Sequence, residues 1–258
     1  MTKFLLSAFF AFVLAAGLTS CDSTTDPTTS EPTVLKFSAK KNGIFKYDSY
    51  IVDTSDAAGN NPDRLIPESK VVVTESVTDT GVTYDGRSNC TIVSSGGDSI
   101  IYSQDANGDL YRYNFGFDYL NSFPLLVLYV GHEINVKWVL VAKLTDQVGQ
   151  TWVAAKDSVF LASNGTYVYL QSNATQKADT TIEVMGAGVR CKHVQHVVTA
   201  TATLSTSPLV QANGKDVVDT YISAELGSTV WDYFRSATVS GAINAKAQGL
   251  WKIMTSHP

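Results

Sequence analysis

The segment Cys191-Lys192-His193-Val194-Gln195-His196 carries the side chains that most often bind zinc or copper. A metal site needs three or four such groups to converge on one point. If the segment is a β-strand, Cys191 and His193 share one face and His196 lies on the other, because side chains alternate along a strand. The spacing therefore predicts a plain strand, in which the three side chains would meet only across a bulge.

The segment Asp105-Ala106-Asn107-Gly108-Asp109 is similar to the start of a calcium-binding loop. Such a loop needs a bidentate glutamate further along, and here Leu110-Tyr111-Arg112 follow, which favour a strand. We interpret the segment as the tip of a β-hairpin. The sequence contains no Gly-x-Ser-x-Gly, His-Glu-x-x-His or phosphate-loop motif. We therefore expect a non-enzymatic protein with no catalytic residues, no metal site and no cofactor.

Cysteine chemistry of another kind is expected at Cys21. Lys3 precedes an apolar run from Phe4 to Leu18, and Leu18-Thr19-Ser20-Cys21 is typical of a lipobox. The sequence predicts that residues 1–20 are a lipoprotein signal peptide and that Cys21 carries the lipid. A plain signal peptide and a single membrane helix are the alternatives. The apolar run is shorter than the roughly 20 residues of a spanning helix, and no Lys or Arg follows it closely to stop transfer.

Two further cysteines, Cys90 and Cys191, lie 101 positions apart (191 minus 90), a spacing that carries no information about pairing. An oxidising envelope compartment would permit a disulfide between them. Two separate buried thiols are the alternative.

Residues 21–33 are predicted to be the lipidated cysteine and a disordered tether, because Thr, Ser, Asp and Pro dominate and cannot form a core. Residues 34–258 are predicted to be a single β-rich domain. Removing residues 1–20, whose one charge is Lys3, leaves 18 of the 19 basic residues against 24 acidic ones, a net charge of −6. With no basic block, we expect no nucleic-acid partner. The expected location is the cell envelope, on the periplasmic or surface side, with the lipid anchor in a bacterial membrane.

Thr, Ser, Val, Tyr and Gly are abundant and charged residues make up only 17% of the chain, which favours β-sheet over a helical bundle. Four Asn-Gly pairs stand between β-like runs, at Asn42-Gly43, Asn107-Gly108, Asn164-Gly165 and Asn213-Gly214. Asn-Gly suits the two positive φ angles of a type I′ turn, so each pair predicts a hairpin. The fold class is therefore predicted to be mainly β and built from antiparallel hairpins.

A two-residue loop at Asn107-Gly108 would place Tyr102 opposite Tyr113 on a buried face, with Arg112 on the solvent side. Around Asn164-Gly165 both strand faces are apolar, so a cover is expected on each. Three longer stretches are interpreted as follows: 53–69 as a polar loop, 136–142 as a central strand, and 239–253 as one alternating strand with Trp251 and Ile253 on its apolar face.

Residues 115–130 are the most apolar part of the chain after the signal segment. They are too short to span a bilayer and are interpreted as a buried strand or loop that closes the core, or as an apolar lip over a ligand cavity. In either case we expect an apolar concave sheet face that this stretch partly covers. The candidate ligand-binding residues of the lip are Phe115, Phe117, Tyr119, Leu120 and Phe123.

Several weak motifs together resemble uncharacterised bacterial envelope lipoproteins of the lipoprotein-carrier (LolA/LolB-like) half-barrel class. They are the lipobox with its tether, Lys143-Leu144 before Gly149-Gln150-Thr151-Trp152, the series Thr181–Gly186 and Cys191–Val194, and the stretch Asp219–Val230. The resemblance implies a strongly curved antiparallel sheet, a half-barrel or open barrel, with a covering loop or short helix and often an apolar cavity. It implies no catalytic residues.

The leading hypothesis is a membrane-anchored, non-enzymatic envelope lipoprotein that binds an apolar ligand, such as a lipid or acyl chain, or an envelope protein partner. The alternative is an envelope carbohydrate-binding module or hydrolase, in which Trp138, Trp152, Trp231 and Trp251 supply a sugar platform, although tryptophans more often belong to a core. A dry internal cavity would favour the first hypothesis. A surface row of aromatic residues beside paired carboxylates would favour the second.

Overall fold

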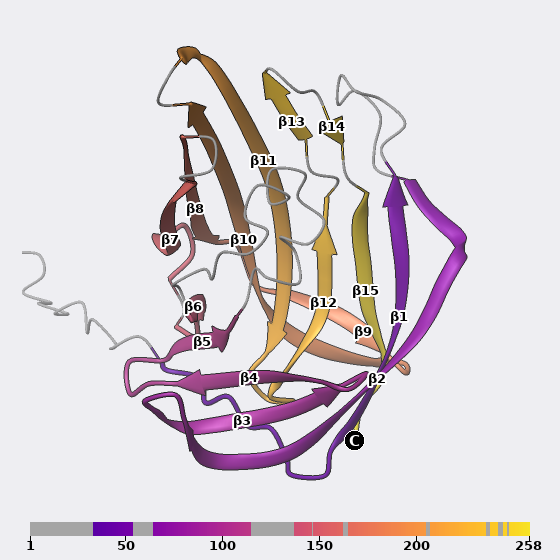
Figure 1. Ribbon diagram of the computed structural model, residues 1–258. Helices are drawn as coiled ribbons and strands as arrows, with labels where there is room; N and C mark the ends of the chain where they lie inside the picture. Colours follow the sequence, from indigo (N-terminus) through magenta and orange to yellow (C-terminus); the bar gives the residue numbers. More distant parts are fainter. Residues whose placement is uncertain are drawn as a thin grey trace, which may run out of the picture. The chain divides into compact units, whose positions relative to one another are not determined.

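The computed structural model describes residues 33–53, 64–114, 137–145, 147–161, 165–204, 207–235, 238–241, 245–246 and 248–258 (Figure 1). Within these ranges the chain forms strands joined by turns and loops, and no helix there is long and apolar enough to span a membrane. The strands are β1 (Ile44–Asp53), β2 (Arg64–Tyr84), β3 (Arg87–Ser95), β4 (Asp98–Gln104), β5 (Asp109–Tyr113), β6 (Trp138–Lys143), β7 (Thr151–Leu161), β8 (Thr166–Gln176), β9 (Thr180–Val184), β10 (Ala187–Leu204), β11 (Ser207–Ser223), β12 (Ser228–Phe234), β13 (Thr238–Gly241), β14 (Ala245–Lys246) and β15 (Gly249–Ser256).

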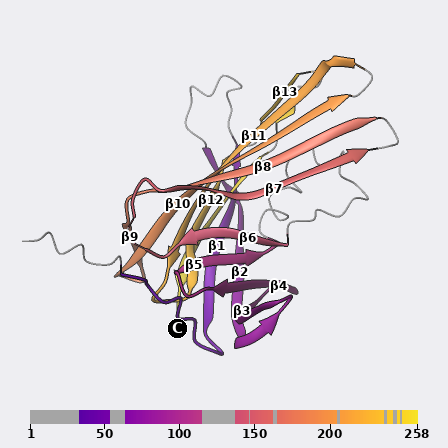
Figure 2. The ribbon, with the colours of Figure 1, turned by 90° about the vertical axis from the view of Figure 1, so that its left-hand side faces the viewer.

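The strands pair antiparallel in the order β6-β5-β4-β3-β2-β1-β15-β12-β11-β10-β8-β7. Off this path, β13 pairs with β11 and β14, and β9 pairs with one end of β10. The expectation of a mainly β fold built on one antiparallel sheet is confirmed. Figure 2 shows β7, β8, β10 and β11 extending well past the layer that contains β3 and β4.

The sheet curls for two reasons: strand β2 bends, and the two strands at the ends of the sheet, β6 and β7, meet. β2 pairs first with β1 and then with β3, and register shifts between Val77 and Tyr84 mark bulges that add twist. At the ends of the sheet, Trp152 Nε1 of β7 donates to the Leu140 carbonyl of β6 at 2.9 Å. The ring of His196, in β10, lies 3.0 Å from the Val141 carbonyl, which also belongs to β6. The sheet is therefore nearly closed and barrel-shaped, as the predicted open barrel requires.

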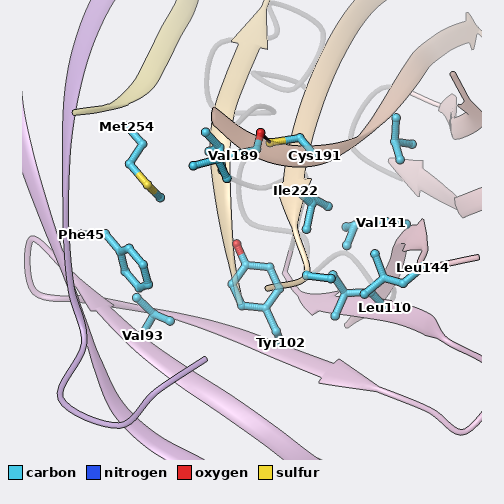
Figure 3. Packing of buried hydrophobic residues seen from close by; sticks show 14 of the residues in the cluster. Phe45, Val93, Tyr102, Leu110, Val141, Leu144, Val189, Cys191, Ile222 and Met254 are labelled. Carbon is cyan, nitrogen blue, oxygen red and sulfur yellow. Dashed lines mark hydrogen bonds between the residues drawn. The ribbon is translucent and has the colours of Figure 1, made fainter. Parts of the chain in front are cut away.

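The core fills the inside of this barrel. Its buried side chains come from strands at both ends and in the middle of the sheet (Figure 3), among them Phe45, Val93, Tyr102, Leu110, Val141, Leu144, Ile222 and Met254. Leu110 and Leu144 have no exposed surface at all. Full burial of such a side chain contributes about 2 kcal/mol relative to exposure, so this cluster is the main source of stability.

The hairpin at Asn107-Gly108 is confirmed, but its predicted register is wrong by one residue. Tyr102 pairs with Arg112 rather than Tyr113. The Asp105 carboxylate accepts hydrogen bonds from the amides of Asn107 and Asp109, and Gly108 has a φ of +84°, which gives a three-residue loop instead of a two-residue one. A one-residue slip turns a whole strand over, so Arg112 lies on the core side.

The hairpin between β7 and β8 is also confirmed, whereas the expected cover on both of its faces is wrong. Phe160 pairs with Tyr167, and Val168 and Leu170 are buried as expected. On the other face Phe160, Tyr167 and Tyr169 are between 41% and 50% exposed. Asn164 itself lies outside the described residues.

The other two hairpin predictions are wrong. Asn42-Gly43 forms a turn that leads into β1, with Gly43 N bonded to the Lys40 carbonyl, but the residues described before it form no strand. Asn213 and Gly214 lie inside β11, opposite Thr201 and Ala200 of β10. A long strand that continues to gain cross-strand pairs overrides the local turn preference of Asn-Gly.

Three predictions for longer stretches need correction. The predicted polar loop 53–69 is strand from Arg64 onward, and residues 54–63 lie outside the described part. The predicted central strand 136–142 exists as β6 but ends the sheet order. The predicted strand 239–253 is divided into β13, β14 and β15, and within β15 it is Met254 that is buried in the core, on the face opposite Trp251 and Ile253.

The core side of the sheet also carries charged side chains, which the prediction of an apolar concave face does not include. Lys252 donates a short hydrogen bond to the buried Glu75 carboxylate, and its Nζ lies 4.2 Å from the centroid of the Tyr47 ring. Burial raises the pKa of Asp232 nearby, although the charges of Lys252 and Arg112 oppose the rise. Opposite charges that lie close together inside the barrel explain how four ionisable groups are tolerated there.

Candidate functional site

The lipidation residue Cys21 and the predicted apolar lip, Phe115, Phe117, Tyr119, Leu120 and Phe123, lie outside the described residues. The proposal for a ligand site must therefore come from other parts of the barrel. Two features stand out: a pocket beside the N-terminal segment, and an aromatic row on the outer face of the sheet.

Residues 33–40, here called the strap, have no regular secondary structure and lie against the end of the barrel. Leu35 N donates to the Leu144 carbonyl at 2.8 Å, and Ser38 N donates to the Ala224 carbonyl at 2.9 Å. The Gln104 side chain accepts from Phe37 N and donates to the Leu35 carbonyl, so it satisfies two backbone groups of the strap at once. The strap therefore bridges the β6 end of the sheet and the turn between β11 and β12.

The strap is also held by apolar packing. Phe37 lies with its ring centroid 5.1 Å from that of Tyr102, and Leu35 and Ala39 pack against the core cluster. These residues alternate with the exposed Lys36, Ser38 and Lys40. The alternation of apolar and polar residues lets an irregular segment close the core on one side and face solvent on the other.

Beside the strap lies a pocket of about 340 Å³, here called the strap pocket. Its walls come from the strap, from β10, and from the end of β11 with the turn that follows it; the lining residues are Leu35, Lys36, Ser38, Asp179, Arg190, Lys192, Ile222, Ala224 and Glu225. Leu35, Ile222 and Ala224 form its apolar part, in which Ile222 and Ala224 belong to the buried core. The volume falls within the roughly 300–1,000 Å³ of small-molecule sites, which are mostly apolar with a few placed polar groups.

The polar groups of the strap pocket centre on Asp179. Its Oδ2 lies 2.8 Å from Arg190 Nη2 and 3.0 Å from Lys192 Nζ. The Lys192 side chain is only 3% exposed, whereas that of Arg190 is 62% exposed. Lys192 is therefore fixed inside the end of the barrel, whereas Arg190 lies at the surface. Both cations contact the same carboxylate oxygen.

A second cavity, of about 1,020 Å³, shares the strap residues Lys36 and Ser38 with the strap pocket. Its lining also includes Arg87, Asn89 and Asp105, and its surface is polar and apolar in about equal parts. The Arg87 guanidinium stacks on the Tyr111 ring at 3.6 Å, so one cation of this cavity is already engaged. The surface of the strap pocket is the more apolar of the two, so the strap pocket is the stronger candidate site for an apolar ligand.

The outer face of the sheet carries a row of aromatic side chains on β10, β11, β12 and β15. His193 stacks on Tyr221 with ring centroids 4.2 Å apart, and Tyr221 stacks on Trp231 at 4.5 Å. Both pairs are nearly parallel, at 12° and 10°. Trp251 follows at 4.6 Å from Trp231, tilted by 44°. These are directly paired or neighbouring positions of adjacent strands.

Asp219 lies beside the aromatic row. It accepts hydrogen bonds from His193 Nε2 at 2.9 Å, Gln195 Nε2 at 3.0 Å and Arg235 Nη2 at 3.2 Å. Burial works to raise the pKa of Asp219, but the hydrogen bonds from His193 and Gln195 and the charge of Arg235 outweigh it, and the pKa is lower than usual. The carboxylate is thus fully used in holding the row together.

This geometry favours a structural ladder over a sugar platform. Rings that are parallel at these separations cover one another's faces, and solvent meets mainly their edges. The four tryptophans do not form one surface either, because Trp138 packs edge-on against Tyr84 and Tyr113, and Trp152 reaches across the barrel seam to β6. Cross-strand aromatic pairs of this kind stabilise a sheet.

The cysteines and histidines considered as metal ligands are separated. His193 bonds to Asp219 on the outer face, and His196 is fully buried on the inner face, as strand alternation predicts. No group of three His, Cys, Asp or Glu side chains that could hold a metal ion occurs among the described residues. Cys90 and Cys191 are both buried and free, so the disulfide alternative is wrong. Burial, together with the charge of Asp179, raises the pKa of Cys191 to about 12, which leaves it an unreactive thiol.

No protein-family model and no curated protein matches the sequence. Among solved structures, a protein from Bacteroides fragilis described as exported and as having a YmcC-like fold is 8% identical, with 88% of this chain and 100% of that chain covered and a TM-score of 0.34. The hypothetical lipoprotein YmcC from Escherichia coli is 11% identical, with 85% and 89% covered and a TM-score of 0.30. At these values the likeness is one of coarse outline. Neither is described as LolA/LolB-like, so that resemblance is not confirmed.

Proposed function

We propose that this chain is a lipid-anchored, non-enzymatic protein of the bacterial cell envelope that binds an acyl chain in the strap pocket. The observation that carries the proposal is the pocket itself: an apolar surface of Leu35, Ile222 and Ala224 with a small number of fixed polar groups. The alternative of a carbohydrate-binding module has weaker support, because the aromatic ring faces are occupied by one another.

The position of the pocket agrees with a membrane anchor. The strap, which forms one wall, continues directly from the predicted tether, and twelve tether residues have a root-mean-square reach of about 20 Å. An anchored Cys21 would therefore keep the strap end of the barrel close to the lipid surface. A pocket at that end is where an acyl chain leaving or entering a membrane would be met first.

The test is titration of a fluorescent fatty acid into the chain that lacks residues 1–20 and carries Cys21→Ser, which removes the lipid. We expect saturable binding at micromolar concentrations. Glu225→Trp should abolish it, because Glu225 is an exposed residue that lines the strap pocket and not the second cavity, and a bulky ring there fills the pocket without entering the core.

Ala106→Trp is the matched control, since Ala106 lines only the second cavity. It should leave binding unchanged. If neither variant changed the affinity, or if the chain bound no fatty acid at micromolar concentrations, the proposed function would be wrong. If Ala106→Trp alone abolished binding, the ligand would occupy the second cavity instead.

A further inference from the structure

We infer that the strap pocket selects an amphiphile with an anionic oxygen head group, a carboxylate or a phosphate, an inference that rests on the acyl-chain binding proposed above. Lys36, Arg190 and Lys192 line the pocket with Asp179 and Glu225. Among the described residues, three cations and two carboxylates therefore line one pocket of a chain that as a whole is acidic.

The cations are arranged so that a head group would meet a fixed charge. Lys192 is held against Asp179 and is almost fully buried, and Arg190 donates through both Nε and Nη2 to the same carboxylate oxygen. A guanidinium that is already oriented loses little freedom when a second anion approaches its exposed edge. Lys36, an exposed residue of the strap, lines the same pocket and supplies a further cation that an anionic head group could reach.

The apolar surface and the cations belong to the same pocket, and this combination decides the class of ligand. A small free anion would use the cations and make no use of the apolar part of the pocket. A neutral apolar molecule would use the apolar part and make no use of the fixed cations. An amphiphile uses both, because charge-assisted hydrogen bonds position its head while burial of its chain supplies most of the affinity.

The experiment compares a fluorescent fatty acid with its methyl ester, which has the same chain and no charge, on the chain without residues 1–20 and with Cys21→Ser. The acid should bind at least about tenfold more tightly than the ester, which is the contribution of one good charge-assisted hydrogen bond to the affinity. Arg190→Gln and Lys36→Gln should each weaken binding of the acid and leave binding of the ester unchanged.

Lys41→Gln is the matched control. Lys41 is a cation just beyond the strap that pairs with Asp79 at 2.8 Å and does not line the pocket, so its loss should change neither affinity. Circular dichroism melts of all three variants establish that they fold.

The outcomes separate the inference from the proposed function. If neither acid nor ester binds, the proposed function fails. If both bind equally well, or if Lys41→Gln weakens the acid as much as Arg190→Gln does, acyl-chain binding stands and the selection of an anionic head is overturned. Displacement of the acid by inorganic phosphate, with no displacement by the ester, would also overturn the inference, in favour of a free-anion site.

Discussion

Gly227 lies directly against Ala39 of the strap: a Cβ atom at position 227 would stand 2.0 Å from the Ala39 backbone nitrogen and 2.4 Å from its Cα. Gly227 belongs to the turn between β11 and β12 and has a φ of +63°. The strap can follow its path only because position 227 has no side chain. A single turn residue thus determines where one wall of the strap pocket stands.

Gly227→Ala should lower the free energy of unfolding by about 3 kcal/mol or more, because it adds displacement of the strap to the roughly 1–2 kcal/mol that a left-handed backbone costs an L-residue. Gly86→Ala is the control, since Gly86 has a φ of +79° and open space around its missing Cβ. Urea denaturation of both variants measures the difference. Equal losses would mean that the strap moves aside without cost.

His196 predicts a loss of stability in acid. Complete burial lowers its pKa to about 4, only partly offset by its hydrogen bond to the Val141 carbonyl. The unfolded chain takes up the proton near pH 6.5 while the folded chain stays neutral, so stability falls as the pH drops from 6.5 and levels off below 4. The folded and unfolded pKa values of His196 differ by about 2.5, which corresponds to a loss of about 3 kcal/mol in the free energy of unfolding.

His196→Gln retains a donor for the Val141 carbonyl and cannot titrate. Urea unfolding at pH 7 and pH 4.5 should therefore show a smaller acid-induced loss for this variant than for the native chain. The carboxylates contribute the same background to both. Identical pH profiles would show that His196 is not the group responsible.

Cys21→Ala should abolish membrane association, because an acyl chain contributes about 0.8 kcal/mol for each buried methylene and no other anchor is predicted. Metabolic labelling with a palmitate analogue followed by membrane fractionation is the measurement. We expect the unlabelled variant in the soluble fraction, with a melting curve like that of the native barrel, since residue 21 belongs to the predicted tether and not to the predicted β domain. Undiminished label in the variant would refute the lipobox.

The sequence predicts the fold class better than the details of pairing. Alternation and Asn-Gly turns identify the strands of the hairpins around residues 107 and 164. They fail at Asn213-Gly214, where continued pairing with β10 outweighs the turn. They also fail by one residue at Asn107-Gly108, where the Asp105 carboxylate selects a longer loop. Local signals give the presence of a strand, and hydrogen bonding decides its register.

The strap pocket could not be predicted from the sequence. The Cys191-to-His196 segment has the residue types of a metal cluster, but the residue of it that lines the strap pocket is Lys192, whose partner Asp179 lies in the turn before β9. Nothing in the sequence connects Leu35 with Arg190 or Ile222. Only the closure of the barrel brings the start of the domain against the end of β11, and that closure depends on long-range contacts.

The aromatic row leads to the last prediction, which separates a structural ladder from a sugar-binding surface. In a ladder the stacking of Tyr221 on Trp231 stabilises the sheet, so a double-mutant cycle with Tyr221→Leu and Trp231→Leu should show a coupling of about 0.5–1.5 kcal/mol. Phe160 and Tyr167, an exposed pair on β7 and β8 with ring centroids 4.5 Å apart and tilted by 36°, provide the comparison cycle and should give a smaller value. The native chain should also show no binding to soluble glucans in affinity electrophoresis. A coupling near zero, together with glucan binding that Trp231→Leu abolishes, would make a carbohydrate-binding module the better account, because the rings would then be held for a ligand instead of for the sheet.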